Sequence, residues 1–407
     1  MVLLFSTRPV LLVWHLFIVV AIASSNQLPL NDLVDSYHGA AVSPGNISLP
    51  LFSSLERSAR LVDIAYCVGT TGITAPFSCA SRCKGFSSVY LVSTWNTGVL
   101  LSDSCGYIAV DLGMQTEAKD IPHGPAILVA FRGTYSIANT VMDLSTIPQE
   151  YVPYQPRDNQ TDHGDKPRDS CSNCTVHMGF MASWNQARRI VLPRLLTVRD
   201  KYPSFPVHLM GHSLGGAVAA LAALELRMSL GWKNVVVTTF GEPMVGNAEF
   251  VAYLNKAFML EGTDDYVRDL KGPTYRRVTH IGDPVPLLPL AEWGFRPHAG
   301  EIHIRKADLP PSPEDLRLCR GNSDPKCIAD GGGETSSAYS ALSETSLEMG
   351  STSGDFTAEE KQFRLPAKLK LWQLFFAHRD YFWRLGLCVP GGDPWDWGRE
   401  YSETMSV

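Results

Sequence analysis

Apolar and polar positions alternate along this chain with two periods, one typical of helices and one typical of strands. From residue 49 to residue 67, apolar side chains recur every three or four positions, which predicts an amphipathic helix. The same period predicts helices over residues 180–202, 217–230 and 247–259. Short apolar runs typical of buried strands lie at 88–94, 106–111, 126–131, 205–210, 235–240 and 275–281. Strands that alternate with helices predict an α/β fold, in which helices cover both faces of a mainly parallel sheet.

One turn between a predicted strand and a predicted helix carries the strongest chemical signal. The apolar run ending at Met210 is followed by Gly211-His212-Ser213-Leu214-Gly215, and an Ala-rich segment begins directly afterwards. Glycines two positions before and after a serine let strand and helix pass closely, and the serine then sits in strained backbone with its hydroxyl presented to solvent. The Leu214 N–H and the helix N-terminus face a developing oxyanion. We interpret Ser213 as a nucleophile.

A nucleophilic serine needs an imidazole to take its proton and a carboxylate to orient that imidazole. Hydrolases with this turn carry the acid and then the histidine after the serine. Asp283 is the favoured acid because it follows the strand predicted at 275–281, although an aspartate in an ordinary turn before proline has the same pattern. Among His298, His303 and His378, the last is the favoured base because aromatic residues flank it, whereas the other two fit structural positions.

The N-terminal 23 residues have the pattern of a secretory signal peptide, with a basic residue, a short apolar run and small residues at its end. This run is shorter than the roughly 20 apolar residues that span a bilayer, so cleavage is favoured over anchoring and no stable transmembrane anchor is expected. Sequons at Asn46, Asn159 and Asn173 agree with N-glycosylation. We therefore expect a secreted, extracellular glycoprotein; an uncleaved signal would instead anchor it in the vacuole or endoplasmic reticulum.

The length of 407 residues could hold one large domain or two smaller ones, and a single domain is expected over residues 24–407. A formal net charge of −6 gives no basic surface for nucleic acid, which is therefore an unexpected partner. Residues 331–355 are rich in Gly, Ser, Thr and Glu, which predicts a flexible insertion, and residues 389–407 form a polar C-terminal tail.

Nine cysteines in an oxidising compartment should mostly form disulfides. Close spacing suggests local pairs at Cys79/Cys83, Cys171/Cys174 and Cys319/Cys327. The spacing of Cys171 and Cys174 also occurs in redox and zinc sites, but no matching second pair follows, so a disulfide is favoured. An odd number of cysteines leaves at least one thiol free or paired between chains.

Several separate blocks of this sequence resemble the secreted class 3 lipases of fungi, which include triacylglycerol lipases and feruloyl esterases. The likeness runs from about Cys67 to Cys388 and rests on residues 130–134, 176–180, 211–216, 241–247 and 275–283, and on His378 with Tyr381-Phe382 behind it. The resemblance implies a single α/β-hydrolase domain with Ser213 as nucleophile, Asp283 as acid and His378 as base. It further implies that Thr134 supplies an oxyanion-hole donor beside Leu214, and that no metal or organic cofactor is needed.

The resemblance also has implications for the cysteines and for a lid. It implies a long-range disulfide between Cys67 and Cys388, short ones at Cys79/Cys83 and Cys171/Cys174, an extra one at Cys319/Cys327, and a free Cys105. A short lid helix would cover residues 136–144, with an apolar face from Ile137, Val141, Met142 and Leu144. An ordinary surface helix packed on the core would show the same pattern.

These observations predict a serine carboxylic-ester hydrolase. A triacylglycerol lipase that acts through an acyl-enzyme at an oil–water interface is favoured, because the expected lid is apolar. The alternatives are a feruloyl or other soluble-ester esterase and a phospholipase A1. A catalytically silent surface-binding relative is a further alternative, against which the intact set of serine, acid, histidine and oxyanion residues argues.

Overall fold

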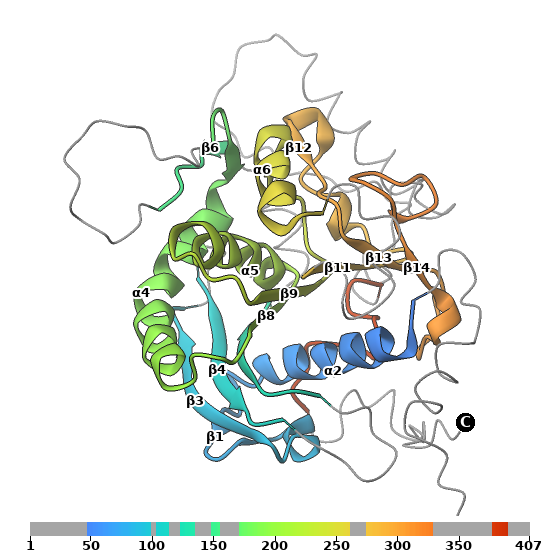
Figure 1. Cartoon of the computed structure of the whole chain (residues 1–407). Helices are drawn as coiled ribbons and strands as arrows, with labels where there is room; N and C mark the ends of the chain where they lie inside the picture. The colour runs from blue at the N-terminus through green and yellow to red at the C-terminus, as the bar shows by residue number, and fades with distance from the viewer. Residues whose placement is uncertain are drawn as a thin grey trace, which may run out of the picture. The chain divides into compact units, whose positions relative to one another are not determined.

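A computed structural model describes residues 47–98, 103–113, 123–134, 148–154, 171–260, 274–328 and 377–389, all within one compact unit. Its centre is an eight-stranded sheet with the order β14-β13-β11-β9-β8-β5-β4-β3 (Figure 1). The strands are β3 (Val89–Asn96), β4 (Cys105–Asp111), β5 (Ala126–Phe131), β8 (Val207–His212), β9 (Val235–Phe240), β11 (Tyr275–His280), β13 (Glu301–Ile304) and β14 (Leu316–Leu318). The sheet is parallel from β5 to β13 and antiparallel at both edges. This is the predicted α/β-hydrolase architecture.

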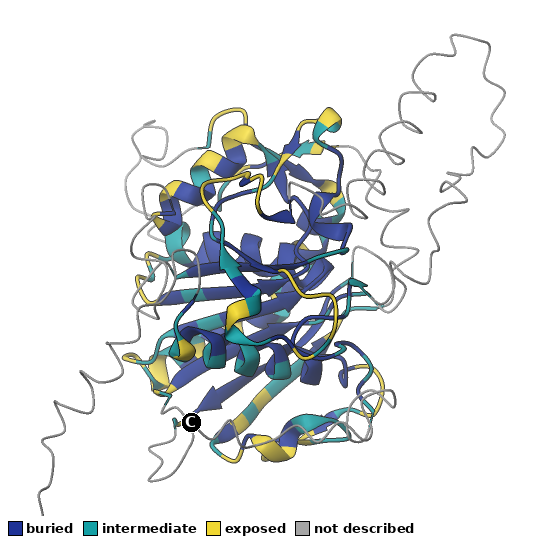
Figure 2. Cartoon of the chain, turned by 90° about the vertical axis from the view of Figure 1, so that its right-hand side faces the viewer, coloured by how far each residue is buried: buried dark blue, intermediate teal, exposed yellow. Residues whose placement is uncertain are grey.

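Helices cover both faces of this sheet. The helical segments are α2 (Leu49–Ala65), α4 (Met178–Lys201), α5 (Leu214–Leu224), its π-helical continuation η2 (Glu225–Ser229) and α6 (Ala248–Phe258). Alternate residues of β5 show the two faces: Ile127, Val129 and Phe131 belong to the core with α4 and α5, whereas Leu128 and Ala130 belong to the core with α2. Every residue of this strand is buried, and dark blue strands run through the centre of the molecule in Figure 2. This burial explains why its sequence is continuously apolar.

Short elements that the sequence did not predict complete the fold. A second sheet, ordered β12-β10-β7-β6, lies among them, as does a two-stranded pair of β1 and β2. Their bounds are β1 (Ile73–Thr74), β2 (Ser78–Cys79), β6 (Pro148–Glu150), β7 (Thr175–His177), β10 (Gly246–Asn247) and β12 (Phe295–Arg296). Four 3-10 helices, η1 (Arg82–Gly85), η3 (Val285–Leu287), η4 (Ala291–Trp293) and η5 (Pro313–Asp315), occupy connections. Strands of two or three residues are too short to show a period.

One predicted boundary differs in a way that matters for the site. The sequence predicted a strand over residues 205–210, whereas β8 continues through Gly211 to His212. The added residues pair with Thr239 and Phe240 of β9. The neighbouring strand therefore extends β8 to the residue directly before Ser213.

A buried carboxylate ties α2 to the sheet. Asp111 at the end of β4 accepts hydrogen bonds from the Ser88 hydroxyl at 2.7 Å and the Gly113 N–H at 2.9 Å, and it pairs with the Arg57 guanidinium of α2. His123 Nε2 lies 3.2 Å from Asp111 Oδ2. Burial alone would raise the pKa of Asp111, but the hydrogen bonds and the two basic neighbours lower it to about 2. This carboxylate is therefore a link that depends on its charge.

No helix within the described ranges combines the length and the apolar character of a membrane span. The predicted signal peptide, the predicted lid, the insertion at 331–355, Asn46, Asn159 and residues 390–407 all lie outside the described residues.

Candidate active site

Ser213 lies in the tight turn between β8 and α5, with φ of 57° and ψ of −131°. This backbone conformation is rare for a residue other than glycine. A Cβ atom on Gly211 would lie 2.1 Å from the Gly215 carbonyl oxygen, and one on Gly215 would lie 2.4 Å from the Phe131 carbonyl oxygen. Only glycine fits at either position, as predicted for a strand that passes closely under a helix.

The prediction that the serine hydroxyl is presented to solvent is wrong for this structure. Ser213 is 2% exposed, and its Oγ atom is buried. The turn after β5 packs directly on it, because a Cβ atom on Gly133 would lie 2.9 Å from Ser213 Cβ. The hydroxyl is therefore enclosed by the protein and not presented to solvent.

The structure brings Asp283 and His378 together, although 95 residues separate them in sequence. His378 Nδ1 lies 3.0 Å from both carboxylate oxygens, and both side chains are fully buried. The carboxylate also accepts hydrogen bonds from the Val285 N–H at 2.9 Å and from the Tyr381 hydroxyl at 2.5 Å. A carboxylate beside Nδ1 places the hydrogen there, so that Nε2 of the neutral ring is free to take a proton.

Ser213 Oγ and His378 Nε2 share one property. Both atoms are buried, and neither has a hydrogen-bond partner among the described residues. The His378 ring also lies beside the serine turn, since its centroid is 4.7 Å from that of His212. A hydroxyl and an imidazole nitrogen in such positions are suited to proton transfer during nucleophilic attack.

The two expected oxyanion donors lie at adjacent strand ends. Thr134 follows β5, and Leu214 begins α5 directly after β8. These strands are parallel neighbours with Phe131 opposite Gly211. Parallel strands that end together bring both backbone N–H groups to the carboxyl edge of the sheet, where the N-terminal amides of α5 also point.

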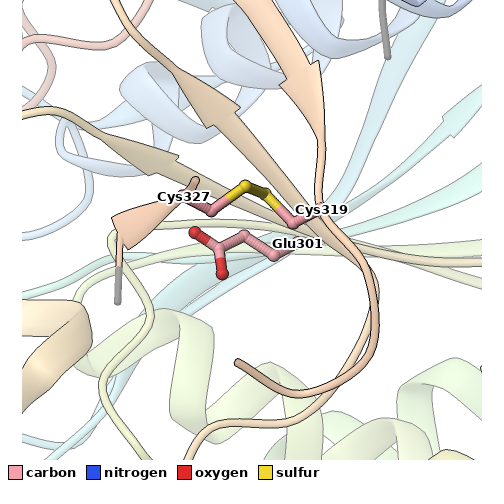
Figure 3. Close-up of side chains that lie close together, drawn as sticks. All are labelled: Glu301, Cys319 and Cys327. Carbon is pink, nitrogen blue, oxygen red and sulfur yellow. A yellow bond between two sulfur atoms is a disulfide. The ribbon is translucent and has the colours of Figure 1, made fainter. Parts of the chain in front are cut away.

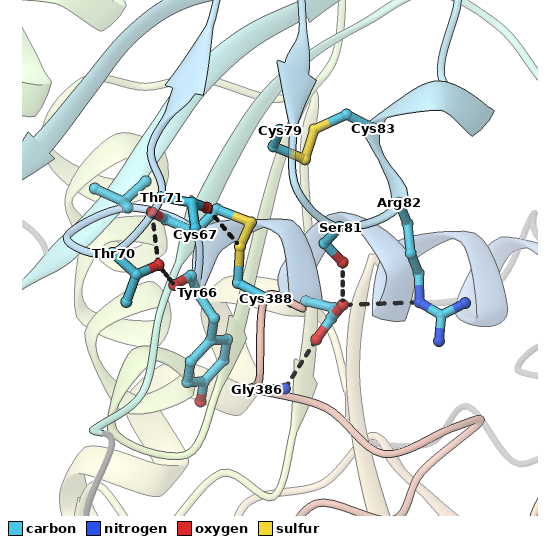
Figure 4. The surroundings of a disulfide bond; sticks show 12 residues. Tyr66, Cys67, Thr70, Thr71, Cys79, Ser81, Arg82, Cys83, Gly386 and Cys388 are labelled. Carbon is cyan, nitrogen blue, oxygen red and sulfur yellow. Dashed lines mark hydrogen bonds and ion pairs between the residues drawn. A yellow bond between two sulfur atoms is a disulfide. The ribbon is translucent and has the colours of Figure 1, made fainter. Parts of the chain in front are cut away.

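The segment that carries His378 is fixed to α2 and to the residues that follow α2. A disulfide joins Cys67 to Cys388, and the carboxylate of Asp63 accepts a hydrogen bond from the Gly386 N–H at 2.8 Å (Figure 4). Asp63 also accepts a hydrogen bond from the Ser81 hydroxyl at 2.9 Å. Burial raises the pKa of Asp63. The segment that carries His378 is therefore attached by a disulfide to Cys67, just after α2, and by a hydrogen bond to Asp63 within α2.

The other two candidate histidines have structural partners, as predicted. His303 Nδ1 lies 2.9 Å from the Thr279 hydroxyl, and burial lowers the pKa of His303 to about 4. His298 Nε2 lies 3.0 Å from a carboxylate oxygen of Glu242. Among the described residues, neither ring hydrogen-bonds to Asp283 or His378, and both rings satisfy buried polar groups.

The cysteines form disulfides at Cys67/Cys388, Cys79/Cys83, Cys171/Cys174 and Cys319/Cys327, and Cys105 is free and buried. Burial raises the pKa of the Cys105 thiol. Glu301 lies beside the Cys319–Cys327 disulfide, a grouping that could hold a metal only if both sulfurs were thiolates (Figure 3). Both Glu301 oxygens are already engaged, with the Thr279 hydroxyl at 2.7 Å and with Arg277 at 3.0 Å.

Sequence reasoning missed the hydroxyl of Tyr381 as a donor to Asp283, and it missed Asp63 altogether. Tyr381 follows His378 by three residues, and the sequence indicates it only as an aromatic neighbour of that histidine. The requirement that a buried carboxylate be fully hydrogen-bonded could have suggested the tyrosine. Asp63 interrupts the apolar face of a predicted amphipathic helix, which was the available signal. The predicted lid residues lie outside the described residues. The predicted glycosylation site Asn173 is exposed in a turn.

Comparisons with known proteins identify the family of this chain. The family model "Lipase (class 3)" matches residues 128–293. The chain is 56% identical to secreted mono- and diacylglycerol lipase 2 of Gibberella zeae, over 88% of this chain and 87% of the relative. It is also 56% identical to lipase A of Sodiomyces alcalophilus, over 89% and 88% of the two chains.

Solved structures show the same fold. The Lip2 lipase of Yarrowia lipolytica superposes with a TM-score of 0.64 at 27% identity, covering 85% of this chain and 97% of that one. A triacylglycerol lipase described as having a serine protease triad at its catalytic centre superposes with a TM-score of 0.55 at 25% identity, covering 83% and 96%. The chain belongs to the class 3 lipase family and is a secreted serine ester hydrolase.

Proposed function

We propose that this chain hydrolyses acylglycerol esters through an acyl-enzyme formed on Ser213. Ser213 Oγ attacks the ester carbonyl carbon while His378 Nε2 takes its proton, and Asp283 orients the ring and stabilises the imidazolium. The observation that carries the proposal is that two buried atoms, Ser213 Oγ and His378 Nε2, both lack a hydrogen-bond partner among the described residues. The carboxylate 3.0 Å from His378 Nδ1 supports the same roles.

The remaining steps follow from the same groups. The tetrahedral oxyanion accepts hydrogen bonds from the N–H groups of Thr134 and Leu214. The imidazolium of His378 then gives its proton to the departing alcohol, which leaves an acyl ester on Ser213. A water molecule repeats the sequence, loses its proton to His378, and releases the carboxylic acid as Ser213 recovers its hydrogen.

Triacylglycerol is the favoured substrate, at an oil–water interface. Ile137, Val141, Met142 and Leu144 make the expected lid over 136–144 apolar, which supports this choice because an apolar lid is compatible with a lipid surface. Mono- and diacylglycerols are a second candidate, favoured by the name of the Gibberella zeae relative at 56% identity. Both candidate substrates are hydrolysed by the same chemistry, and they differ in the number of acyl chains that the active site must accommodate.

Hydrolysis of tributyrin and of dibutyrin, each followed across its solubility limit, tests the proposal. A Ser213→Ala variant of confirmed fold serves as the blank, and a fluorophosphonate reports the reactive serine. We expect a rate increase when droplets appear, phosphonate labelling of the wild type, and neither in the variant. Equal rates for wild type and variant would refute the role of Ser213. A rate that saturates below the solubility limit would refute the interfacial part, and the ratio of the two substrates decides between the candidates.

A further inference from the structure

A chain of hydrogen bonds joins distant parts of the site through His212, the residue before Ser213. His212 Nε2 lies 2.7 Å from the backbone carbonyl oxygen of His378, and His212 Nδ1 lies 2.5 Å from the Tyr66 hydroxyl. The Tyr66 oxygen lies 3.2 Å from the backbone nitrogen of Gly133. The end of α2, the turn after β5, the nucleophile turn and the histidine segment are therefore linked in one network.

The direction of each hydrogen bond follows from the groups involved. A carbonyl oxygen only accepts, so His212 Nε2 must carry a hydrogen. Burial and the neighbouring His378 lower the pKa of His212 well below its ordinary value, so the ring is neutral and Nδ1 accepts. The Tyr66 hydroxyl therefore donates to Nδ1, and its oxygen accepts from the Gly133 N–H. One arrangement satisfies every bond in the network.

Both ends of this network reach groups that the proposed reaction uses. The carbonyl at one end belongs to His378, whose ring packs 4.7 Å from the His212 ring. The N–H at the other end belongs to Gly133, which directly precedes Thr134. The packing at this end is close, because a Cβ atom on Gly133 would lie 2.6 Å from the Tyr66 hydroxyl oxygen. A shift of Tyr66 or His212 would therefore displace the base or the oxyanion turn.

We propose that His212 and Tyr66 are positioning residues for ester hydrolysis. They fix the position of the His378 backbone relative to the turn after β5, which carries Thr134. His212 stays neutral during the reaction, so the proton of the nucleophile goes to His378. This inference rests on the function proposed above. A merely structural pair would lower stability when altered, whereas a positioning pair lowers kcat with little change in KM.

The test uses Tyr66→Phe with Tyr107→Phe as its matched control. Tyr107 is equally buried in the core beside α2, and its hydroxyl donates to the Leu61 carbonyl oxygen at 2.8 Å, with no hydrogen bond to the site within the described ranges. Tyr66→Phe leaves the Gly133 N–H and His212 Nδ1 without this partner. On a soluble p-nitrophenyl butyrate, we expect Tyr66→Phe to lower kcat about tenfold with KM within about twofold. Tyr107→Phe should lower Tm and leave kcat within about twofold.

Two conservative variants of His212 separate the ends of the network. In His212→Gln the side-chain amide can reach the position of Nε2 and keep the bond to His378, whereas in His212→Asn it can reach the position of Nδ1 and keep the bond to Tyr66. Adding Tyr66→Phe should therefore cost little in the glutamine background, where that link is already cut, and nearly its full factor in the asparagine background. The glutamine variant should retain the higher kcat.

The outcomes distinguish this inference from the proposed function. If folded wild type neither hydrolyses esters nor reacts with fluorophosphonate, the proposed function fails. If wild type is active but Tyr66→Phe lowers kcat no more than Tyr107→Phe, the positioning inference alone is overturned. An equal Tyr66→Phe factor in wild type and in both His212 backgrounds would also overturn it. Where a His212 variant fails to fold, the comparison of the two tyrosines still decides.

Discussion

Gly241→Ala is expected to lower kcat strongly without abolishing the fold. Gly241 follows β9 with φ of +57°. A Cβ atom added there would lie 2.7 Å from the Tyr381 hydroxyl oxygen, 2.8 Å from His378 Cε1 and 3.0 Å from Asp283 Oδ2. One methyl group would therefore press on the base, the carboxylate and the donor that orients the carboxylate.

The cost has two parts that can be separated. An alanine in left-handed backbone costs about 1–2 kcal/mol wherever it occurs. The contacts add a second part, because carbon atoms pack at about 3.5 Å or more and the His378 ring must move by roughly 0.5 Å or more to accommodate the methyl group. Misplacement on this scale can lower kcat by up to about a hundredfold. We expect a loss of about ten- to a hundredfold, or roughly 1.4–2.7 kcal/mol in the barrier.

Two other glycines provide controls for the backbone part. Gly231 has φ of +67° and no atom within 4 Å of the added Cβ. Gly282 has φ of +81° beside Asp283, and its nearest neighbour, Ala377 Cβ, lies at an ordinary 3.7 Å. Gly231→Ala and Gly282→Ala therefore carry the conformational cost without the close contacts.

The assay is kcat and KM on p-nitrophenyl butyrate, with Tm from thermal unfolding. The two controls should lose stability and keep kcat within about threefold, whereas Gly241→Ala should lose stability and the additional factor in kcat. Phosphonate labelling of Gly241→Ala should be slowed to the same extent, since it uses the same serine and base. If kcat of Gly241→Ala matches that of Gly231→Ala, the close packing around His378 is not needed for catalysis and the reasoning is refuted.

Two further predictions concern stability. Because the folded pKa of Asp111 is lowered to about 2, its carboxylate stabilises the native state above about pH 4 and loses this effect as the pH falls through 2. Urea unfolding of Asp111→Asn should show a deficit of about 2 kcal/mol at pH 6 and under about 1 at pH 2, and equal deficits would contradict this. Replacing Cys67 and Cys388 by alanine opens a loop of sequence separation 321, against 4 for Cys79 and Cys83. We expect the free energy of unfolding to fall by about 6 kcal/mol in the first variant and by about 2 in the second, with a greater loss of kcat in the first, and the reverse order would refute this.

The sequence predicted the central strands well because helices cover them on both sides. β5 and β9 match the predicted bounds, and each is a continuous apolar run. The sheet of β6, β7, β10 and β12 was not predicted, because its strands of two or three residues are held by partners distant in sequence. The prediction of Ser213 was local, since strand, turn and helix lie within one short stretch. The choice of His378 depended on chain order and aromatic neighbours.

The residues that support the site were harder to predict, and His212 shows why. Successive side chains along a strand point to opposite faces. Met210 belongs to the core that contains α2, Tyr66 and the segment around Tyr381, whereas Leu209 belongs to the core with α4 and α5. Because β8 continues to His212, this side chain shares the face of Met210 and reaches Tyr66 and His378. The sequence predicted a strand that ends at Met210, and such a strand does not fix the direction of the His212 side chain. That direction is set by the pairing of Gly211 and His212 with β9, which the sequence did not predict.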